Sequence, residues 1–99
     1  MSISDHDIDQ LTRLFNAVAD PTRAKILLFV MDGKRRSSDI AAMLDMTTSA
    51  TSHQLRWLRE RRIVVSEKIG RETFYALSDD CIREIIEVAL RHIHEEDAN

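Results

Sequence analysis

The sequence predicts a mainly α-helical fold with one small β-hairpin, and three observations support this class. Apolar residues recur every three or four positions in long segments near both ends of the chain. Two runs rich in β-branched and aromatic residues, 63–65 and 73–77, flank Gly70 and indicate two strands joined by a turn. Glycine and proline are scarce, with two and one in 99 residues, so each of them marks an element boundary.

Two helices are expected in the first third of the chain. The first covers about Asp5 to Ala19, where apolar residues follow helical spacing. Asp20 is a favourable N-cap residue, and Pro21 suits the first helical position, so a second helix is expected to begin there. This helix is predicted to stop near Gly33, because glycine is common just beyond a helix C-terminus.

A short helix, a tight turn and a longer helix are predicted next. A polar loop over residues 34–37 leads into a helix from Ser38, which can cap it, to Leu44. Residues 45–47 form the turn, and the longer helix covers Thr48 to about Arg61.

The hairpin and a last helix complete the chain. The strands at 63–65 and 73–77 enclose a hairpin tip at residues 68–71, and the last helix covers about Asp79 to His94. The order is therefore helix, helix, helix, helix, strand, strand, helix. A short helix, a tight turn and a longer helix followed by a basic hairpin is the winged helix-turn-helix order. We predict a single domain of this kind over residues 1–99, allowing flexibility in residues 1–7.

Composition and charge limit the possible functions. No apolar run reaches the length of about 18–20 residues that a membrane helix needs, and a membrane partner is not expected. The one cysteine cannot form an internal disulfide, so a cytoplasmic location is expected. The net charge is −3, but residues 34–71 carry nine basic and four acidic side chains, a local balance of +5. This basic middle indicates a polyanionic partner, although its Lys34–Arg36 cluster also suits a solvated loop.

The longer middle helix has the composition of a DNA-reading helix. Five hydroxyl side chains occur within the six residues 47–52, although hydroxyl residues are poor choices inside a helix. Capping the helix needs only one of them, so we interpret the others as groups that contact base edges and phosphates. Arginines at 56, 59, 61 and 62 follow and can reach phosphates. The predicted DNA-contacting residues are Thr48, Ser49, Ser52, His53, Gln54, Arg56, Lys68 and Arg71.

Three segments resemble the ArsR/SmtB family of metal-sensing repressors. They are the recognition-helix run Ser49–Arg59, the opening Asp20–Arg23 of the second helix, and the wing run Gly70–Leu77. The resemblance covers about residues 8–96. It implies a homodimer joined through the first and last helices, which binds an inverted-repeat operator as a transcriptional repressor.

The last helix carries the candidate metal ligands Asp79, Cys81, His92 and Glu95. Cys81 and His92 share a helix face but lie roughly 16 Å apart along the axis, so one helix cannot close a site. Two antiparallel helices of a dimer could bring Asp79 and Cys81 of one chain to His92 and Glu95 of the other. The spacing is similar to the last-helix site of the family's zinc-sensing branch, which has histidine where Cys81 stands. This donor set suits zinc, and the thiolate favours softer ions such as cadmium, as regulatory ligands.

Alternatives remain open at this level. Asp79 can simply cap the helix, Cys81 can be a small apolar side chain, and His6 or His94 can add a ligand. A repressor without metal would answer to oxidation of Cys81 or to no ligand. A winged helix that binds only protein is disfavoured by the basic middle segment. An enzyme built on a Cys81–His92 pair is disfavoured by their separation along one helix, so no enzymatic activity is expected.

Overall fold

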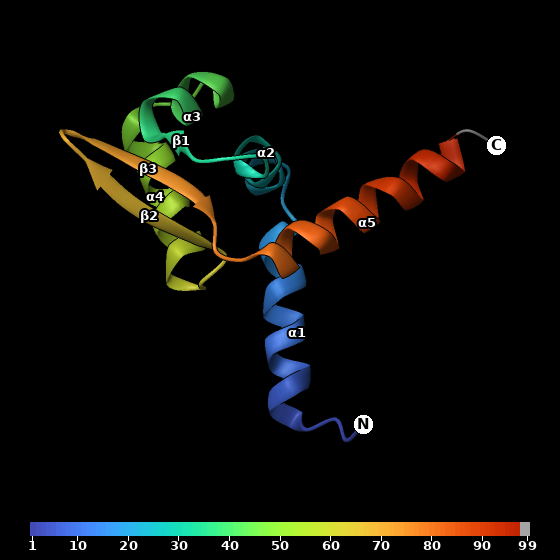
Figure 1. The fold of residues 1–99 in the computed structure, drawn as a ribbon. Helices are drawn as coiled ribbons and strands as arrows, with labels where there is room; N and C mark the ends of the chain where they lie inside the picture. The colour runs from blue at the N-terminus through green and yellow to red at the C-terminus, as the bar shows by residue number, and fades with distance from the viewer. Residues whose placement is uncertain (98–99) are drawn as a thin grey trace.

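The computed structural model describes residues 1–97 and has the element order of a winged helix-turn-helix with one additional short strand. Helices α1 and α2 are followed by the pair α3 and α4, by the β2–β3 hairpin and by a long last helix (Figure 1). The elements are α1 (Asp5–Val18), α2 (Pro21–Val30), β1 (Arg35–Arg36), α3 (Ser37–Leu44), α4 (Thr48–Glu60), β2 (Val64–Ile69), β3 (Glu72–Leu77) and α5 (Asp80–Asp97).

Polar side chains cap four of the five helices at their N-termini. Ser4 and Asp7 form a reciprocal capping box at the start of α1. Asp20 and Thr47 accept hydrogen bonds from backbone N–H groups in the first turns of α2 and α4, and Asp79 does the same for α5. These caps explain why the helices begin within one residue of their predicted starts. The predicted cap of α3 is wrong, because that helix begins at Ser37 after Arg36, and no side chain caps it.

The sheet has three strands rather than the two expected. β1, in the segment predicted to be a polar loop, pairs antiparallel with β3 through Arg35↔Tyr75 and Arg36↔Phe74, giving the order β1-β3-β2. β1 consists of two exposed arginines, which show no alternation of polar and apolar residues typical of a strand. They pair because they lie beside β3, and not because of an intrinsic β-strand propensity. The hairpin register pairs Ile69 with Glu72, which leaves Gly70 and Arg71 as a two-residue turn.

Several element ends also differ from prediction. α2 ends at Val30 instead of near Gly33, whose N–H donates a hydrogen bond to the Val30 carbonyl. β2 continues to Ile69, because residues 66–69 pair with residues 72–75 of β3 although most of them are exposed. α5 continues to Asp97, three residues beyond His94.

The core lies between α2, α3, α4 and the base of the sheet. Buried residues include Ile26, Leu27 and Val30 of α2, Ile40 of α3, and Leu55 and Leu58 of α4. Val64, Tyr75 and Leu77 of the hairpin close this core, while α1 and α5 contribute only Ala17 and Ile82 as buried members. The body that carries α4 and the wing is therefore packed as one unit.

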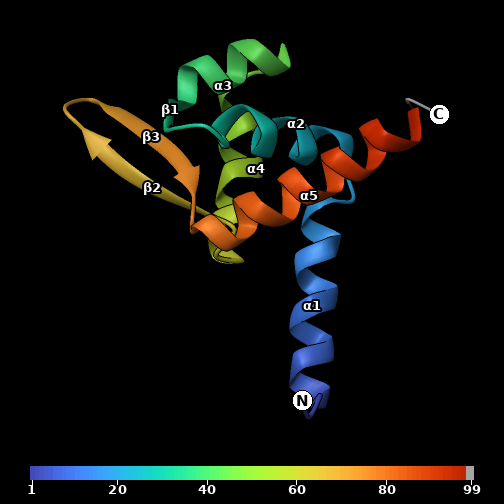
Figure 2. The ribbon, with the colours of Figure 1, turned by 45° about the vertical axis from the view of Figure 1, so that its right-hand side comes forward.

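Helices α1 and α5 project from this body in different directions, away from the wing (Figures 1 and 2). Their apolar faces are only partly covered: the side chains of Ile8, Leu11, Phe15, Ile85, Val88 and Ile93 are 40–57% exposed. A groove of about 250 Å³ between α1, α2 and α5 is lined almost wholly by apolar residues such as Phe15, Leu28 and Ile86. Within residues 1–97, no helix is both long and apolar enough to cross a membrane.

Candidate DNA interface and metal site

The exposed face of α4 carries the polar residues that the sequence singled out. Thr48, Ser49, Ser52, His53 and Arg56 are exposed, and Gln54 is partly buried. The opposite face of α4 packs into the core through Leu55 and Leu58. The buried side chains of Leu55 and Leu58 therefore hold the helix so that its polar face points to solvent. A recognition helix that enters the major groove requires this orientation.

Two of the five hydroxyls in residues 47–52 do not lie on this face. The Thr47 side chain accepts the Ala50 N–H at 3.0 Å and caps α4. Thr51 is 1% exposed, and its Oγ1 has no hydrogen-bond partner among the described residues. Thr48, Ser49 and Ser52 are exposed and do not cap the helix, and they are the three hydroxyl residues in the predicted DNA-contacting set.

The cations near this face fall into two groups. Arg56, Lys68 and Arg71 are exposed and make no hydrogen bond or ion pair within residues 1–97. By contrast, Arg59 donates a hydrogen bond to Ser66 at 3.4 Å. Arg61 stacks on Trp57, with 3.5 Å from its guanidinium carbon to the ring centroid. The first group is available for phosphates, while the second is engaged within the fold.

The wing is tied to α3 by an ion-pair network centred on Arg36. Its guanidinium contacts the carboxylates of Asp39 in α3 at 3.0 Å and Glu72 in β3 at 3.3 Å. Asp39 and then Glu72 raise the pKa of Arg36 above its usual value. Lys34 adds a 3.6 Å ion pair to Glu67 in β2. These partly exposed pairs contribute modest stability, but they link the wing to the helix pair that presents α4.

The candidate metal ligands on α5 lie at the two ends of the helix. The Asp79 carboxylate accepts the Ile82 N–H at 2.9 Å, so the capping alternative is present in the structure and uses one of the two carboxylate oxygens. Cys81 is exposed and is not part of a disulfide. His92 and Glu95 are exposed near the other end of α5.

His92 makes a local contact in a single chain. Its Nε2 lies 3.4 Å from Glu96 Oε1, one turn further along α5, and both side chains are 69% exposed. No group of three His, Cys, Asp or Glu side chains able to hold a metal occurs within residues 1–97 of one chain. The four candidates therefore could only meet between two chains.

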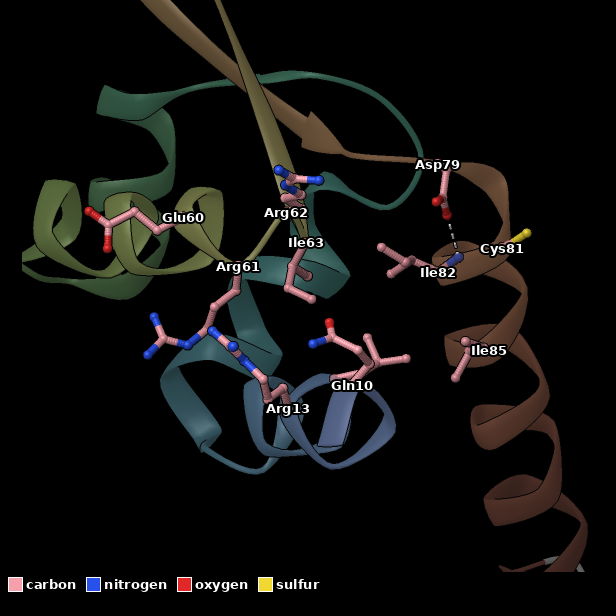
Figure 3. A pocket seen from close by; sticks show the side chains of 11 residues that line it. Gln10, Arg13, Glu60, Arg61, Arg62, Ile63, Asp79, Cys81, Ile82 and Ile85 are labelled. Carbon is pink, nitrogen blue, oxygen red and sulfur yellow. Dashed lines mark hydrogen bonds between the residues drawn. The ribbon is translucent and has the colours of Figure 1, made fainter. Parts of the chain in front are cut away.

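A cleft of about 500 Å³ adjoins Asp79 and Cys81 (Figure 3). Its opposite wall comes from Gln10 and Arg13 of α1 and from residues 60–63, where α4 ends and β2 begins. In that turn Arg62 adopts the left-handed region with φ 60°, which is uncommon for a non-glycine residue. No local pattern in the sequence predicts this cleft, because three segments far apart in the chain form it.

Comparison with known proteins identifies the family. Residues 20–66 match the bacterial regulatory protein arsR family. The chain is 33% identical over 88 residues to a transcriptional repressor SmtB homolog from Synechocystis, covering 89% of this chain and 67% of that protein. It is also similar to the AntR antimony-specific transcriptional repressor, whose crystal structure matches with TM-score 0.85 and 28% identity over 100% of this chain and 90% of that one.

The fold prediction is confirmed by a further solved structure. The homodimeric winged helix-turn-helix DNA-binding domain of a possible ArsR-family regulator from Mycobacterium bovis matches with TM-score 0.85. It is 22% identical and covers 96% of this chain and 91% of that one. Members of this family are transcriptional regulators and not enzymes, which agrees with the sequence-based prediction. The chain belongs to the ArsR family of bacterial transcriptional regulators.

Proposed function

We propose that this protein is a homodimeric transcriptional repressor that binds an inverted-repeat operator in the cytoplasm and is released when zinc or cadmium binds to its last helices. The observation that carries the DNA part is the pattern of side-chain contacts on α4 and the wing. Arg56, Lys68 and Arg71 lack partners within residues 1–97, whereas Arg36 and Arg61 nearby are engaged. Exposed cations without intramolecular partners are the groups that release counterions when they meet phosphates.

Sequence reading would come from the N-terminal half of α4. Ser49, Ser52 and His53 are exposed beside Arg56, and short hydroxyls and imidazole can donate to and accept from base edges. Thr48 and Gln54 flank them. Lys68 lies two residues before Gly70 and Arg71 follows it in the two-residue turn, where the wing would reach the DNA backbone or the adjacent groove.

The dimer is supported by the uncovered apolar faces of α1 and α5. Exposed patches of this kind on a small domain usually mark an interaction surface. Phe15, Ile85 and Val88 lie half exposed on the two helices that project from the body. A second copy packed on these helices would cover them and would hold two α4 helices about 34–36 Å apart, the spacing of successive major grooves.

The metal part is supported by the chemistry of the donors. Thiolate, imidazole and two carboxylates form a set that tetrahedral zinc accepts and that cadmium accepts through sulfur. Cys81, His92 and Glu95 are exposed and so accessible to a second chain. Asp79 would keep its capping hydrogen bond to Ile82 through one oxygen and offer the other. A bound ion would act as a regulatory cross-link between the two α5 helices.

The cleft indicates how the site would influence α4. Asp79 and Cys81 line the same cleft as Arg61, Arg62 and Ile63, the residues that directly follow the recognition helix. Any change in the direction of α5 would alter the packing of that turn. We expect the second ring nitrogen of His92 to couple the metal site to the turn at Arg62 through a hydrogen bond. Imidazoles that bind a metal usually donate this other N–H to a nearby acceptor. A coupling free energy of about 1–3 kcal/mol is typical for such regulation.

Fluorescence anisotropy of the protein on DNA from its own upstream region tests the proposal. With chelator present we expect tight binding that weakens steeply with salt, and with zinc we expect affinity to fall at least about tenfold. Tight binding that ignores both zinc and cadmium would contradict the metal part while leaving the DNA part standing. Binding to neither this DNA nor unrelated DNA at low salt would contradict the DNA part as well.

Paired variants on α5 identify the ligands. His92→Ala should retain binding with chelator and lose the metal response, while His94→Ala serves as the matched control and should retain both. Glu95→Gln should weaken the metal response, and Glu96→Gln should not, even though Glu96 is the residue that contacts His92 in the single chain. If Glu96→Gln weakened the metal response and Glu95→Gln did not, Glu96 would be the metal ligand instead of Glu95.

A second candidate function is a repressor that responds to oxidation of Cys81. The observation that favours it is that Cys81 is exposed, while Asp79 and His92 already have local hydrogen-bond or ion-pair partners. Peroxide treatment followed by DNA titration separates the two mechanisms. Loss of affinity that the wild type shows and Cys81→Ser does not, in chelator throughout, would favour oxidation over metal binding.

A further inference from the structure

Arg23 connects the end of α1 to the helix that follows it. Its Nε donates to the Ala17 carbonyl at 2.9 Å, and its Nη2 donates to the Asn16 carbonyl at 3.0 Å. These carbonyls belong to the last turn of α1, where backbone acceptors lack the usual partner four residues further along the helix. The Asn16 carbonyl also accepts the Ala19 N–H at 3.3 Å. Asp20, the cap of α2, accepts the Arg23 backbone N–H at 3.0 Å and lies 3.9 Å from its guanidinium. The side chain is only 20% exposed, so it is held in place.

The same guanidinium also contacts the recognition helix. Its carbon lies 4.2 Å from the centroid of the Trp57 ring in α4. Arg61 reaches this ring as well, at 3.5 Å, and its Nη1 donates to the Trp57 carbonyl at 3.2 Å. A guanidinium over an indole face is attracted by the ring quadrupole, and tryptophan is the strongest partner for this interaction.

Trp57 stands where such a contact can control the direction of α4. It is partly buried and lies four residues after His53, so the two side chains share one flank of the helix. The Arg23 side chain therefore spans from the last turn of α1 to the flank of the recognition helix. In the homodimer of the proposed function, on which this inference rests, α1 belongs to the dimer interface and α4 to the DNA interface.

We propose that Arg23 and Trp57 form a clamp, assisted by Arg61, that sets the angle between the dimer helices and the recognition helix. Each protomer of the dimer would contact its half-site with α4 and the wing. The clamp would fix the distance between the two α4 helices of the dimer. Arg23 is thus a positioning residue. Its replacement should alter which half-site spacing is bound and leave the contacts within one half-site intact.

The test measures affinity for inverted repeats whose half-sites are moved apart in single base-pair steps, together with affinity for one isolated half-site. For the wild type we expect one preferred spacing, bound at least about a hundredfold more tightly than the isolated half-site. Arg23→Lys keeps the charge but loses the forked donor and most of the stacking, so the preference for one spacing should flatten. Half-site affinity and its salt dependence should not change.

Three further variants complete the design. Trp57→Leu should flatten the preference as Arg23→Lys does, and Trp57→Phe, which retains an aromatic face, should largely restore it. Arg35→Lys is the matched control, because Arg35 also donates to a carbonyl, that of Phe29, and stacks on the Phe29 ring at 4.6 Å without contacting α4. It should behave as wild type. Sedimentation and thermal unfolding establish that each variant is folded and dimeric.

The outcomes separate the clamp from the function on which it rests. A wild type without any spacing preference would contradict the homodimeric operator-binding proposal and the clamp with it. A wild type that prefers one spacing, together with Arg23→Lys and Trp57→Leu variants that prefer it equally, would overturn the clamp alone. If Arg23→Lys lowered the affinity for an isolated half-site as much as the affinity for full sites, the clamp would also be overturned. Arg23 would then only support α4 and the wing within one protomer.

Discussion

Replacing Thr51 by valine should stabilise this protein, although the residue lies in the first turn of the proposed recognition helix. Thr51 is 1% exposed, and its hydroxyl has no hydrogen-bond partner among the described residues. Valine has nearly the same shape, and its helix propensity is close to that of threonine. Thr51→Val therefore exchanges a buried polar group for an apolar one with little change elsewhere.

The expected gain follows from the cost of the unsatisfied hydroxyl. Leaving a buried donor or acceptor without a partner costs about 1–3 kcal/mol. Valine removes this cost, but small shifts in the packing around it offset part of the gain. We therefore expect the free energy of unfolding to rise by about 1–2 kcal/mol. For a domain of this size each kcal/mol corresponds to about 4–8 °C in Tm.

Thermal and urea unfolding at a fixed protein concentration measure this gain, since dimerisation would make Tm concentration-dependent. The matched control is Thr47→Val, the same chemical change at the N-cap of the same helix. Its hydroxyl accepts the Ala50 N–H, so its removal should destabilise the protein by about 1 kcal/mol. DNA affinity of Thr51→Val should equal that of the wild type, because the side chain faces the core. A lower stability of Thr51→Val would mean that the hydroxyl has a partner, and it would refute the reasoning.

Three other predictions concern the DNA surface, the wing and the start of α1. Arg56→Ala should lower the slope of log affinity against log salt by about 0.9 for each phosphate that the side chain neutralises, whereas Arg61→Ala should leave the slope unchanged; equal slopes for both variants would contradict the division of the cations into available and engaged groups. Gly70→Ala should destabilise the protein by about 1–2 kcal/mol in thermal unfolding because φ is +64°, with Gly70→Asn costing less. The Ser4 backbone N–H and then its hydroxyl lower the pKa of Asp7 below its usual value. The folded value thus lies below the unfolded one, so the capping box should stabilise α1 above about pH 4 and be lost in more acid solution, as amide exchange at residues 5–8 would report.

The main elements of the fold could be predicted because each has a local cause. Asp20 followed by Pro21, Thr47 before α4, and the Gly70 turn all act within four residues of their position. The errors have the opposite character. β1 exists because Arg35 and Arg36 lie beside β3, and their own side chains give no sign of a strand.

The candidate site divides in the same way. Helical periodicity placed Ser49, Ser52 and Arg56 on one exposed face of α4, and the structure agrees. Periodicity could not separate Arg56, which lacks partners within residues 1–97, from Arg61, which is engaged by Trp57. Whether an arginine is engaged depends here on the position of the Trp57 ring, one helical turn before Arg61.

The sequence by itself determined the order of elements, the helix starts and the residue types offered to DNA and metal, because these depend on backbone propensity, capping and periodicity over a few residues. Only the tertiary structure decided which side chains remain available. It buried Thr51, stacked Arg23 and Arg61 on Trp57, and brought Asp79 and Cys81 into the cleft beside the end of α4. The physical reason is that most of these contacts join segments far apart in the chain, so they form only when the core positions the helices against one another.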